Sequence, residues 1–152
     1  MKVAIKLIVS FLLTIALSIS VVKASEKIWL ESYDETITLA KKSNKKIAIY
    51  FSGSDWCKPC IKLKKFHLES TIFLLYANEN LVLYQADFPA YKKIDKITKK
   101  VNEQLADKFN SNGVFPLLIL LDVAQNEIGS IGYIDCTPEE YVNKLKSILE
   151  KQ

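Results

Sequence analysis

Two cysteines three positions apart, Cys57 and Cys60, lie where an apolar run ends and a helical pattern begins. The apolar run, residues 47–51, does not alternate with polar residues, which is typical of a strand covered on both faces. Residues 61–66 then show a helical pattern. A strand that leads into a helix here places the first thiol at the helix N-terminus, where free N–H groups and the helix dipole favour an anion. The stretch therefore constrains the fold, because a strand must be followed directly by a helix.

The same placement predicts the chemistry of the two thiols. A thiolate is an anion, so we expect Cys57 to have a lowered pKa, to be exposed and to be the attacking sulfur. Cys60 lies one turn further along the same helix face, close enough to form a disulfide with Cys57. The charge of Lys58, between the two cysteines, either favours the thiolate or is simply solvated. The pattern predicts a redox site.

A metal site is the alternative for the cysteine pair. Zinc takes four ligands in a structural site, and only His67 and Cys136 could complete the set. The sequence contains no second Cys-x-x-Cys and no His-x-x-x-His pattern, so we predict no metal. His67, the only histidine, is expected on the helix surface. Cys136 is left without a partner, and it has either no role or a use in dimerisation or in a mixed disulfide.

The first 24 residues form a separate segment. Lys2 and Lys6 precede an uncharged apolar run, residues 7–22, and small residues follow at the positions that a signal peptidase recognises. The run is shorter than the roughly 20 residues that a membrane-spanning helix needs. We therefore predict a cleaved secretory signal over residues 1–24 and one domain over residues 25–152. An uncleaved membrane anchor is the alternative.

Charge and length limit the classes of protein that remain. The chain has 152 residues, enough for one domain with a core and too few for two. Its formal net charge is +4, and removing the three lysines of the predicted signal lowers it to +1. The excess basic charge therefore belongs largely to the predicted signal, and we expect no nucleic-acid partner. Cys57 and Cys60 are too close in sequence to link distant segments, so the chain is not a disulfide scaffold.

The remaining patterns predict the order β-α-β-α-β-α-β-β-α and hence an α/β fold. The strands are expected near residues 28–30, 46–52, 81–87, 114–121 and 127–133. The helices are expected from Ser32 to about 43, from 57 to about 67 with a second piece to 77, from the lysine-rich stretch 90–100 to the Asn112-Gly113 stop, and from Thr137 to 149. Helices between the first three strands favour parallel pairing, and the turn near 124 favours an antiparallel hairpin. The result is a central mixed β-sheet with helices on both faces. Gly129 and Gly132 indicate a bulge or close packing.

With these elements placed, the sequence resembles the thioredoxin family over nearly all of the predicted domain. Trp56-Cys57-Lys58-Pro59-Cys60 fits the family's Trp-Cys-x-x-Cys motif, including its proline before the second cysteine. Val114-Phe115-Pro116 fits the segment whose proline is cis and faces the redox pair. The final hairpin and the capped last helix fit the end of the fold. Residues 53–57 together with residues 86–89 look like those of exported bacterial thioredoxin-like proteins.

The resemblance implies a thioredoxin fold and an exported thiol–disulfide oxidoreductase, periplasmic or secreted, in a bacterium. Cys57 would attack a substrate disulfide and Cys60 would resolve the mixed disulfide, without a cofactor or a metal. Trp56, Phe115 and Pro116 would bind substrate. The implied partners are cysteine-containing proteins and an unidentified redox partner; we expect a monomer, in contact with a membrane only if the signal is uncleaved.

The direction of exchange and the proton acceptor are less constrained. Pro59 and Lys58 would tune the pair, and the proline favours a reductant. Typical thioredoxins carry a buried acid in the strand before the motif, to which proton transfer for the second cysteine is ascribed, but residues 49–52 contain no carboxylate. Asp55 is expected to be exposed, and Asp87 lies at a strand end. A binding or chaperone module with a regulatory dithiol is the alternative function.

Overall fold

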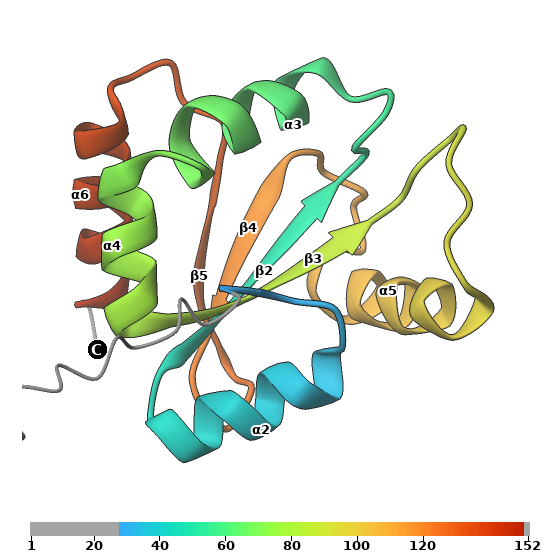
Figure 1. The fold of residues 1–152 in the computed structure, drawn as a ribbon, viewed down its shortest axis with the longest axis horizontal. Coiled ribbons are helices and arrows are strands. Elements are labelled where there is room, and N and C mark those ends of the chain that lie inside the picture. The colour runs from blue at the N-terminus through green and yellow to red at the C-terminus, as the bar shows by residue number, and fades with distance from the viewer. Residues whose placement is uncertain (1–27, 151–152) are drawn as a thin grey trace, which may run out of the picture.

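The computed structural model describes residues 28–150, so the predicted signal lies outside the described residues. Five strands form one sheet in the order β1-β3-β2-β4-β5 (Figure 1). The elements are β1 (Trp29–Leu30), α2 (Tyr33–Ser43), β2 (Lys46–Ser52), α3 (Lys58–Leu63), the π-helical turn η2 (Lys64–Leu68), α4 (Thr71–Asn80), β3 (Leu81–Asp87), α5 (Lys96–Phe109), β4 (Leu117–Leu121), β5 (Glu127–Gly132) and α6 (Pro138–Leu149). Among residues 28–150, no helix is both long enough and apolar enough to span a bilayer.

The sheet is mixed, as predicted. β1 and β2 both run parallel to β3, whereas β4 is antiparallel to β2 and forms the hairpin with β5. The pairing of β4 with β5 shifts register between Leu120 and Leu121. Gly129 lies opposite Leu120, and a Cβ atom added to it would come within 2.7 Å of the Ile148 side chain. The predicted bulge and the close packing of this strand against α6 are therefore both observed.

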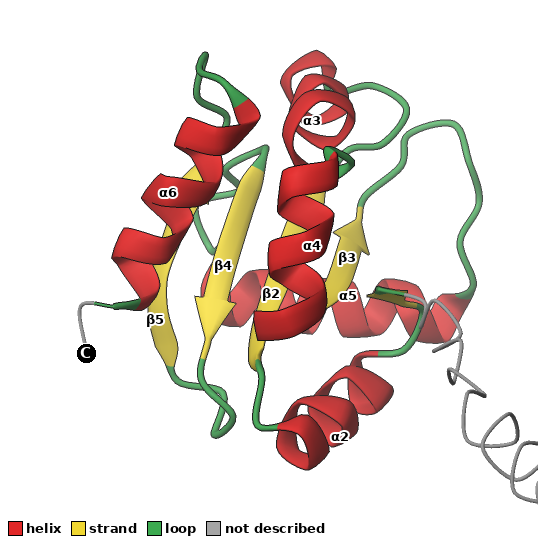
Figure 2. Cartoon of the chain, turned by 60° about the vertical axis from the view of Figure 1, so that its left-hand side comes forward, coloured by secondary structure: helices red, strands yellow, loops and turns green. Residues whose placement is uncertain are grey.

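Helices cover both faces of the sheet (Figure 2). α3, α4 and α6 pack on one face and α2 and α5 on the other, and each layer has its own core. Alternate residues of β2 enter the two cores: Ala48 and Tyr50 face α3, α4 and α6, whereas Ile49 and Phe51 face α2 and α5. This two-sided burial is the reason that β2 reads as an unbroken apolar run.

Side chains fix the ends of several helices where the sequence predicted them. The Ser32 side chain accepts a hydrogen bond from the backbone of Glu35 and begins α2. At α6, the Thr137 hydroxyl accepts from Glu140 N at 3.2 Å, and the Glu140 carboxylate accepts from Thr137 N at 2.8 Å. Such reciprocal pairs satisfy the otherwise free N–H groups of a first helical turn. Asn44 ends α2 in the left-handed conformation.

Two predicted boundaries are wrong. α5 ends at Phe109, before the predicted stop, and β4 begins at Leu117, three residues later than expected. The side chain of Asn110 explains both differences, because its amide donates to Val114 O and accepts from Val114 N, both at 2.9 Å. These bonds close a turn. Because the N–H and C=O groups of Val114 both bond to Asn110, they are not available for pairing with a neighbouring strand.

The helix after Cys57 also differs from the prediction. It continues α3 into the π-helical turn η2, and α4 then starts afresh with Ser70 as its N-cap. A π-helical turn adds one residue to the helical register, so the face that points into the core changes. This change affects the burial of His67, described below.

Candidate redox site

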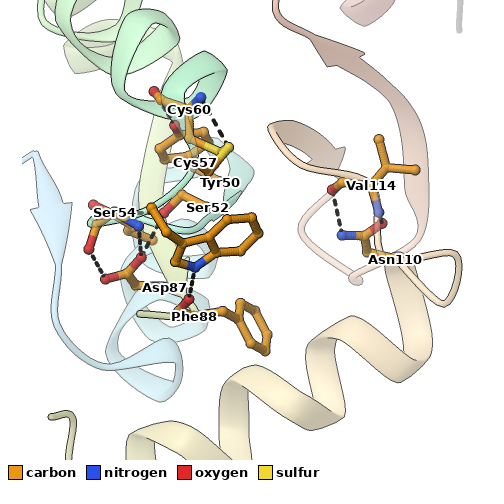
Figure 3. The surroundings of a disulfide bond; sticks show 11 residues. Tyr50, Ser52, Ser54, Cys57, Cys60, Asp87, Phe88, Asn110 and Val114 are labelled. Carbon is orange, nitrogen blue, oxygen red and sulfur yellow. Dashed lines mark hydrogen bonds between the residues drawn. A yellow bond between two sulfur atoms is a disulfide. The ribbon is translucent and has the colours of Figure 1, made fainter. Parts of the chain in front are cut away.

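Cys57 and Cys60 form a disulfide at the junction of β2 and α3, with an S–S distance of 2.03 Å and a Cα–Cα distance of 5.2 Å. Cys57 is the N-cap of α3, and its sulfur accepts a hydrogen bond from Cys60 N at 3.2 Å (Figure 3). The strand-to-helix placement predicted from the sequence is therefore observed. Lys58 and Pro59 occupy the first turn of the helix and are exposed.

Both sulfur-bearing residues are buried in this oxidised form. Cys57 is 5% exposed and Cys60 is 1% exposed. The expectation that Cys57 is exposed is therefore wrong for the disulfide, because its side chain turns inward to cap the helix and to bond to Cys60. Only the order is as expected, with Cys57 nearer to solvent than Cys60.

Trp56 is the exposed aromatic residue beside the disulfide, with 46% of its surface accessible. Its indole nitrogen donates to Phe88 O at 2.7 Å, and its ring lies edge-on to that of Phe115, with centroids 5.8 Å apart. Phe88 and Phe115 make a similar contact at 5.5 Å. We call Trp56, Phe88 and Phe115 the aromatic rim. The sequence pointed to Trp56 and Phe115, and it missed Phe88, which follows β3.

Phe115 and Pro116 connect this rim to the sheet. Phe115 is half-buried and packs against both cores, and Pro116 is buried immediately before β4. The peptide bond between them is cis, as the resemblance implied. The structure thus brings Trp56 and Phe115 into contact and joins Pro116 to them through the chain.

A chain of polar side chains runs beneath the redox helix. Lys64 Nζ donates to Gln85 Oε1 at 3.0 Å, Gln85 Nε2 donates to Ser52 Oγ at 2.8 Å, and Ser52 Oγ donates to Asp87 Oδ1 at 3.0 Å. Asp87 also accepts from the backbone and the hydroxyl of Ser54, at 2.9 and 2.6 Å (Figure 3). We call these five residues the polar chain. Sequence reasoning noted only Asp87; polar residues near the ends of the apolar strands β2 and β3 were the available signal.

The sequence of this chain matches that of a known protein family. A family model described as thioredoxin-like matches residues 28–122, which is more than half of the sequence. The chain belongs to the thioredoxin-like family. This assignment confirms the thioredoxin fold and the α/β class that the sequence predicted.

Two proteins of Chlamydia pneumoniae are similar in sequence. The chain is 31% identical over 127 residues to "Disulfide bond reductase DsbH", covering 84% of this chain and 76% of that protein. It is 29% identical over 126 residues to "Thioredoxin-related protein DsbJ", covering 79% of this chain but only 36% of DsbJ. With the Cys-x-x-Cys pair in place, the match to DsbH shows that this member of the thioredoxin-like family is a protein-disulfide oxidoreductase.

Solved structures of similar proteins share the fold of this chain. The structure described as DsbH oxidoreductase superposes with a TM-score of 0.75 at 30% identity, covering 80% of this chain and 84% of that one. A thioredoxin from Thermus thermophilus superposes with a TM-score of 0.59 at 18% identity, covering 81% of this chain and 87% of that one, and shares the fold.

Tyr50 lies on β2 beneath the second cysteine, in the strand where typical thioredoxins carry an acid. Its hydroxyl donates to Cys60 O at 2.7 Å. Burial raises the pKa of Tyr50 far above its ordinary value, and the charges of Asp87 and Glu69 act in the same direction. Tyr50 therefore remains a neutral hydrogen-bond donor, and it is not a proton acceptor for Cys60.

Asp55 is half-buried rather than exposed, because it organises the loop after β3. Its carboxylate accepts from the backbone N–H groups of Ala90, Tyr91 and Lys92, at 2.8, 2.9 and 2.8 Å. Desolvation acts to raise the pKa of Asp55, but these backbone hydrogen bonds outweigh it and lower the pKa. Asp55 thus connects the residue before Trp56 to the lysine-rich loop.

The prediction of a surface position for His67 is wrong. The residue is 2% exposed, stacks on Tyr141 with ring centroids 4.6 Å apart, and places Nε2 3.1 Å from Ile134 O. It lies in the π-helical turn η2, where the changed register puts His67 and Leu68 in the core. His67 joins the redox helix to the segment before α6.

Cys136 is half-buried and free. Burial raises the pKa of its thiol, and the charge of Glu140 adds to this effect. Within residues 28–150, no three His, Cys, Asp or Glu side chains are grouped as a metal site would need.

Proposed function

We propose that this protein is an exported thiol–disulfide oxidoreductase that acts mainly as a reductant of disulfides in cysteine-containing proteins. The observation that carries the proposal is the Cys57–Cys60 disulfide at the N-terminus of α3, on a chain similar to a disulfide bond reductase.

In the reducing direction, the thiolate of Cys57 attacks one sulfur of a substrate disulfide. The substrate S–S bond breaks, a mixed disulfide forms, and the other substrate sulfur leaves as a thiolate that takes up a proton. Cys60 then loses its proton and attacks the Cys57 sulfur, which forms the Cys57–Cys60 disulfide and releases the second substrate thiolate. Two electrons pass from the two protein cysteines to the substrate, and the two product thiolates take up the proton that Cys60 released and a second proton from solvent, so no organic cofactor or metal is needed.

The surrounding residues have supporting roles in this proposal. Trp56 and Phe115, as part of the aromatic rim, offer an apolar surface beside Cys57 on which a substrate peptide lies, and Pro116 shapes the backbone next to it. Lys58 and Pro59 tune the pair from the first turn of α3. A second dithiol protein would return the oxidised pair to its reduced form, and the enzyme itself is expected to be a monomer.

Reduction of insulin by the purified domain tests the proposal. We expect catalysed precipitation of the insulin B chain with a dithiol as electron source, and none after both cysteines are blocked. Thiol titration with and without a reductant and a chelator separates the alternatives. A binding module would hold a partner without turnover, and a metal site would release thiols only on chelation.

Export is a separate part of the proposal. It rests on the signal pattern of residues 1–24, and it predicts a mature chain that begins at about Ser25. The intact mass of the protein recovered from outside the cytoplasm decides the matter. Retention of residues 1–24 in a membrane fraction would favour an anchor instead.

A further inference from the structure

The resolving step of this enzyme requires a thiolate at Cys60, which is almost fully buried. Burial alone disfavours the charged form of a thiol. Tyr50, on the strand beneath Cys60, bonds to the backbone carbonyl of Cys60 and stays neutral. Another group in this chain must therefore favour the thiolate.

Cys60 lines a cavity of about 400 Å³ that opens to solvent beside the redox helix. The other lining residues are Ser52, Ser54, Ile61, Lys64, Lys65, Glu69, Gln85 and Lys92. Three lysines and one glutamate are thus among the lining residues, and the carboxylate of Asp87 lies behind Ser52. The net positive charge favours an anion at Cys60, and water in the cavity can accept the proton that Cys60 loses.

Lys64 is the cation whose position is fixed. It follows Cys60 by four residues, and side chains at this spacing are neighbours on one helix face. Lys64 is half-buried, and its ammonium donates to Gln85 Oε1 at 3.0 Å. Gln85 is itself oriented by its bond to Ser52, whose hydroxyl donates to Asp87. The polar chain therefore holds the Lys64 ammonium in the wall of the cavity that Cys60 shares.

We propose that Lys64 stabilises the thiolate of Cys60 during resolution of the mixed disulfide, and that Gln85 and Ser52 are positioning residues for its ammonium. The inference rests on the proposed function, in which Cys60 is the resolving thiol. In this step Cys60 gives its proton to water in the cavity, and the sulfur bond to Cys57 forms as the bond from Cys57 to the substrate breaks. The substrate sulfur leaves with the electron pair and is protonated by solvent, and Lys64 transfers no proton in this step.

The test isolates the Cys60 thiol in a Cys57→Ser, Cys136→Ser background and follows its alkylation by iodoacetamide against pH. Lys64→Gln is expected to move the midpoint of the profile to higher pH and to slow alkylation at pH 7 by about tenfold. Lys64→Arg should restore most of the rate. Glu69→Gln should shift the profile the opposite way, because it removes the negative charge from the cavity.

Lys62→Gln is the matched control, since Lys62 is an exposed lysine of the same helix that does not line the cavity. It should leave the profile unchanged. With both active-site cysteines present, Lys64→Gln should slow the resolution of a mixed disulfide while the first attack by Cys57 keeps its rate, a split that general unfolding would not produce. Circular dichroism checks that each variant folds.

An alkylation profile that Lys64→Gln leaves unchanged would overturn the inference, as would an equal shift from Lys62→Gln. The outcome is separable from that of the proposed function. If the wild-type protein reduces insulin but the Lys64 profile does not move, only the role of Lys64 fails. If the wild-type protein reduces no protein disulfide, the proposed function fails whatever the profile shows.

Discussion

The two cysteines differ in their surroundings even though they share one disulfide. Cys57 caps the helix and is the nearer to solvent, whereas Cys60 is enclosed by the core and by the cavity. Cys57→Ser should therefore abolish disulfide reduction, and Cys60→Ser should trap covalent adducts with substrate because nothing resolves them. Mass spectrometry of the adducts and the insulin assay measure the two effects.

Cys136→Ser serves as the control for this pair. It removes the remaining thiol without touching the disulfide, and it should retain activity. The assigned roles would be contradicted if mild alkylation of the reduced protein labelled Cys60 before Cys57.

Gly53 determines where Trp56 can lie. A Cβ atom at Gly53 would overlap the indole ring of Trp56. Gly53→Ala should therefore displace the indole and break both its hydrogen bond to Phe88 and its contact with Phe115. The hydrogen bond and the aromatic pair that hold the indole are each worth about 1 kcal/mol, so its native position should lose about 2 kcal/mol. If substrate lies on the aromatic rim, we expect kcat/KM to fall by up to roughly thirtyfold, mainly through KM.

Fluorescence of Trp56 in a Trp29→Phe background reports the displacement directly, since the sequence has two tryptophans. Gly113→Asn is the control, because Gly113 has open space around it and a φ of +62° that asparagine tolerates. A changed emission together with an unchanged KM in Gly53→Ala would show that the aromatic rim does not bind substrate.

The location of a site residue could be predicted where a short sequence motif contains it. Local motifs contain Cys57, Cys60, Trp56 and Pro116, so their shared location could be predicted, while their roles remain predictions. The polar chain was not found, because Lys64, Ser52 and Gln85 come from a helix and two strands and meet only when the sheet forms. Contacts between residues so far apart in the sequence cannot be predicted from the spacing of residues within one segment.

At the scale of elements, the loop after β3 is the segment whose order depends on one side chain. The Asp55 carboxylate accepts three backbone hydrogen bonds from residues 90–92. Asp55→Ala should leave these N–H groups without their acceptor, and we expect their amide hydrogen exchange to accelerate by about tenfold or more. Asp107→Ala, at an exposed carboxylate of α5, should leave the exchange of this loop unchanged.

The loop should also respond to pH. The pKa of Asp55 in the folded protein lies below its ordinary value of 3.8. A depressed pKa means that the stabilisation is fully present above the unfolded value and is lost as the pH falls through the lower, folded value. Loop amides should therefore remain protected at pH 5 and lose protection only in strong acid; early loss between pH 7 and 5 would contradict the role of Asp55.

Elements were predictable where their ends carry a local signal. The caps at Ser32 and Thr137 and the runs of β2 and β3 were placed correctly from such signals. The π-helical turn η2 was not predicted, because an inserted residue is favoured by packing of His67 on Tyr141 and not by helical spacing. The late start of β4 likewise depends on the turn that the Asn110 side chain closes with Val114. An asparagine at this position does not by itself predict such a turn.

At the scale of the whole molecule, the two cores and the mixed sheet follow from the order of the elements. What that order does not give is the balance between the dithiol and the disulfide states, which is a property of the entire protein. Reference potentials run from about −270 mV for thioredoxin to about −120 mV for a strong oxidant, a difference of roughly 7 kcal/mol for two electrons. An oxidant at the upper end needs several strong interactions with the Cys57 thiolate.

This protein offers Cys57 modest stabilisation of that kind. The sulfur accepts a hydrogen bond from Cys60 N, and the charge of Lys58 is exposed and therefore screened by solvent. We therefore predict a potential nearer to −270 mV than to −120 mV, with a change of less than about 30 mV on Lys58→Gln. Equilibration with glutathione and dithiothreitol couples, followed by alkylation and intact-mass analysis in a Cys136→Ser background, gives the value. A potential close to −120 mV would instead assign the protein to the oxidants, and the direction of electron flow proposed above would have to be reversed.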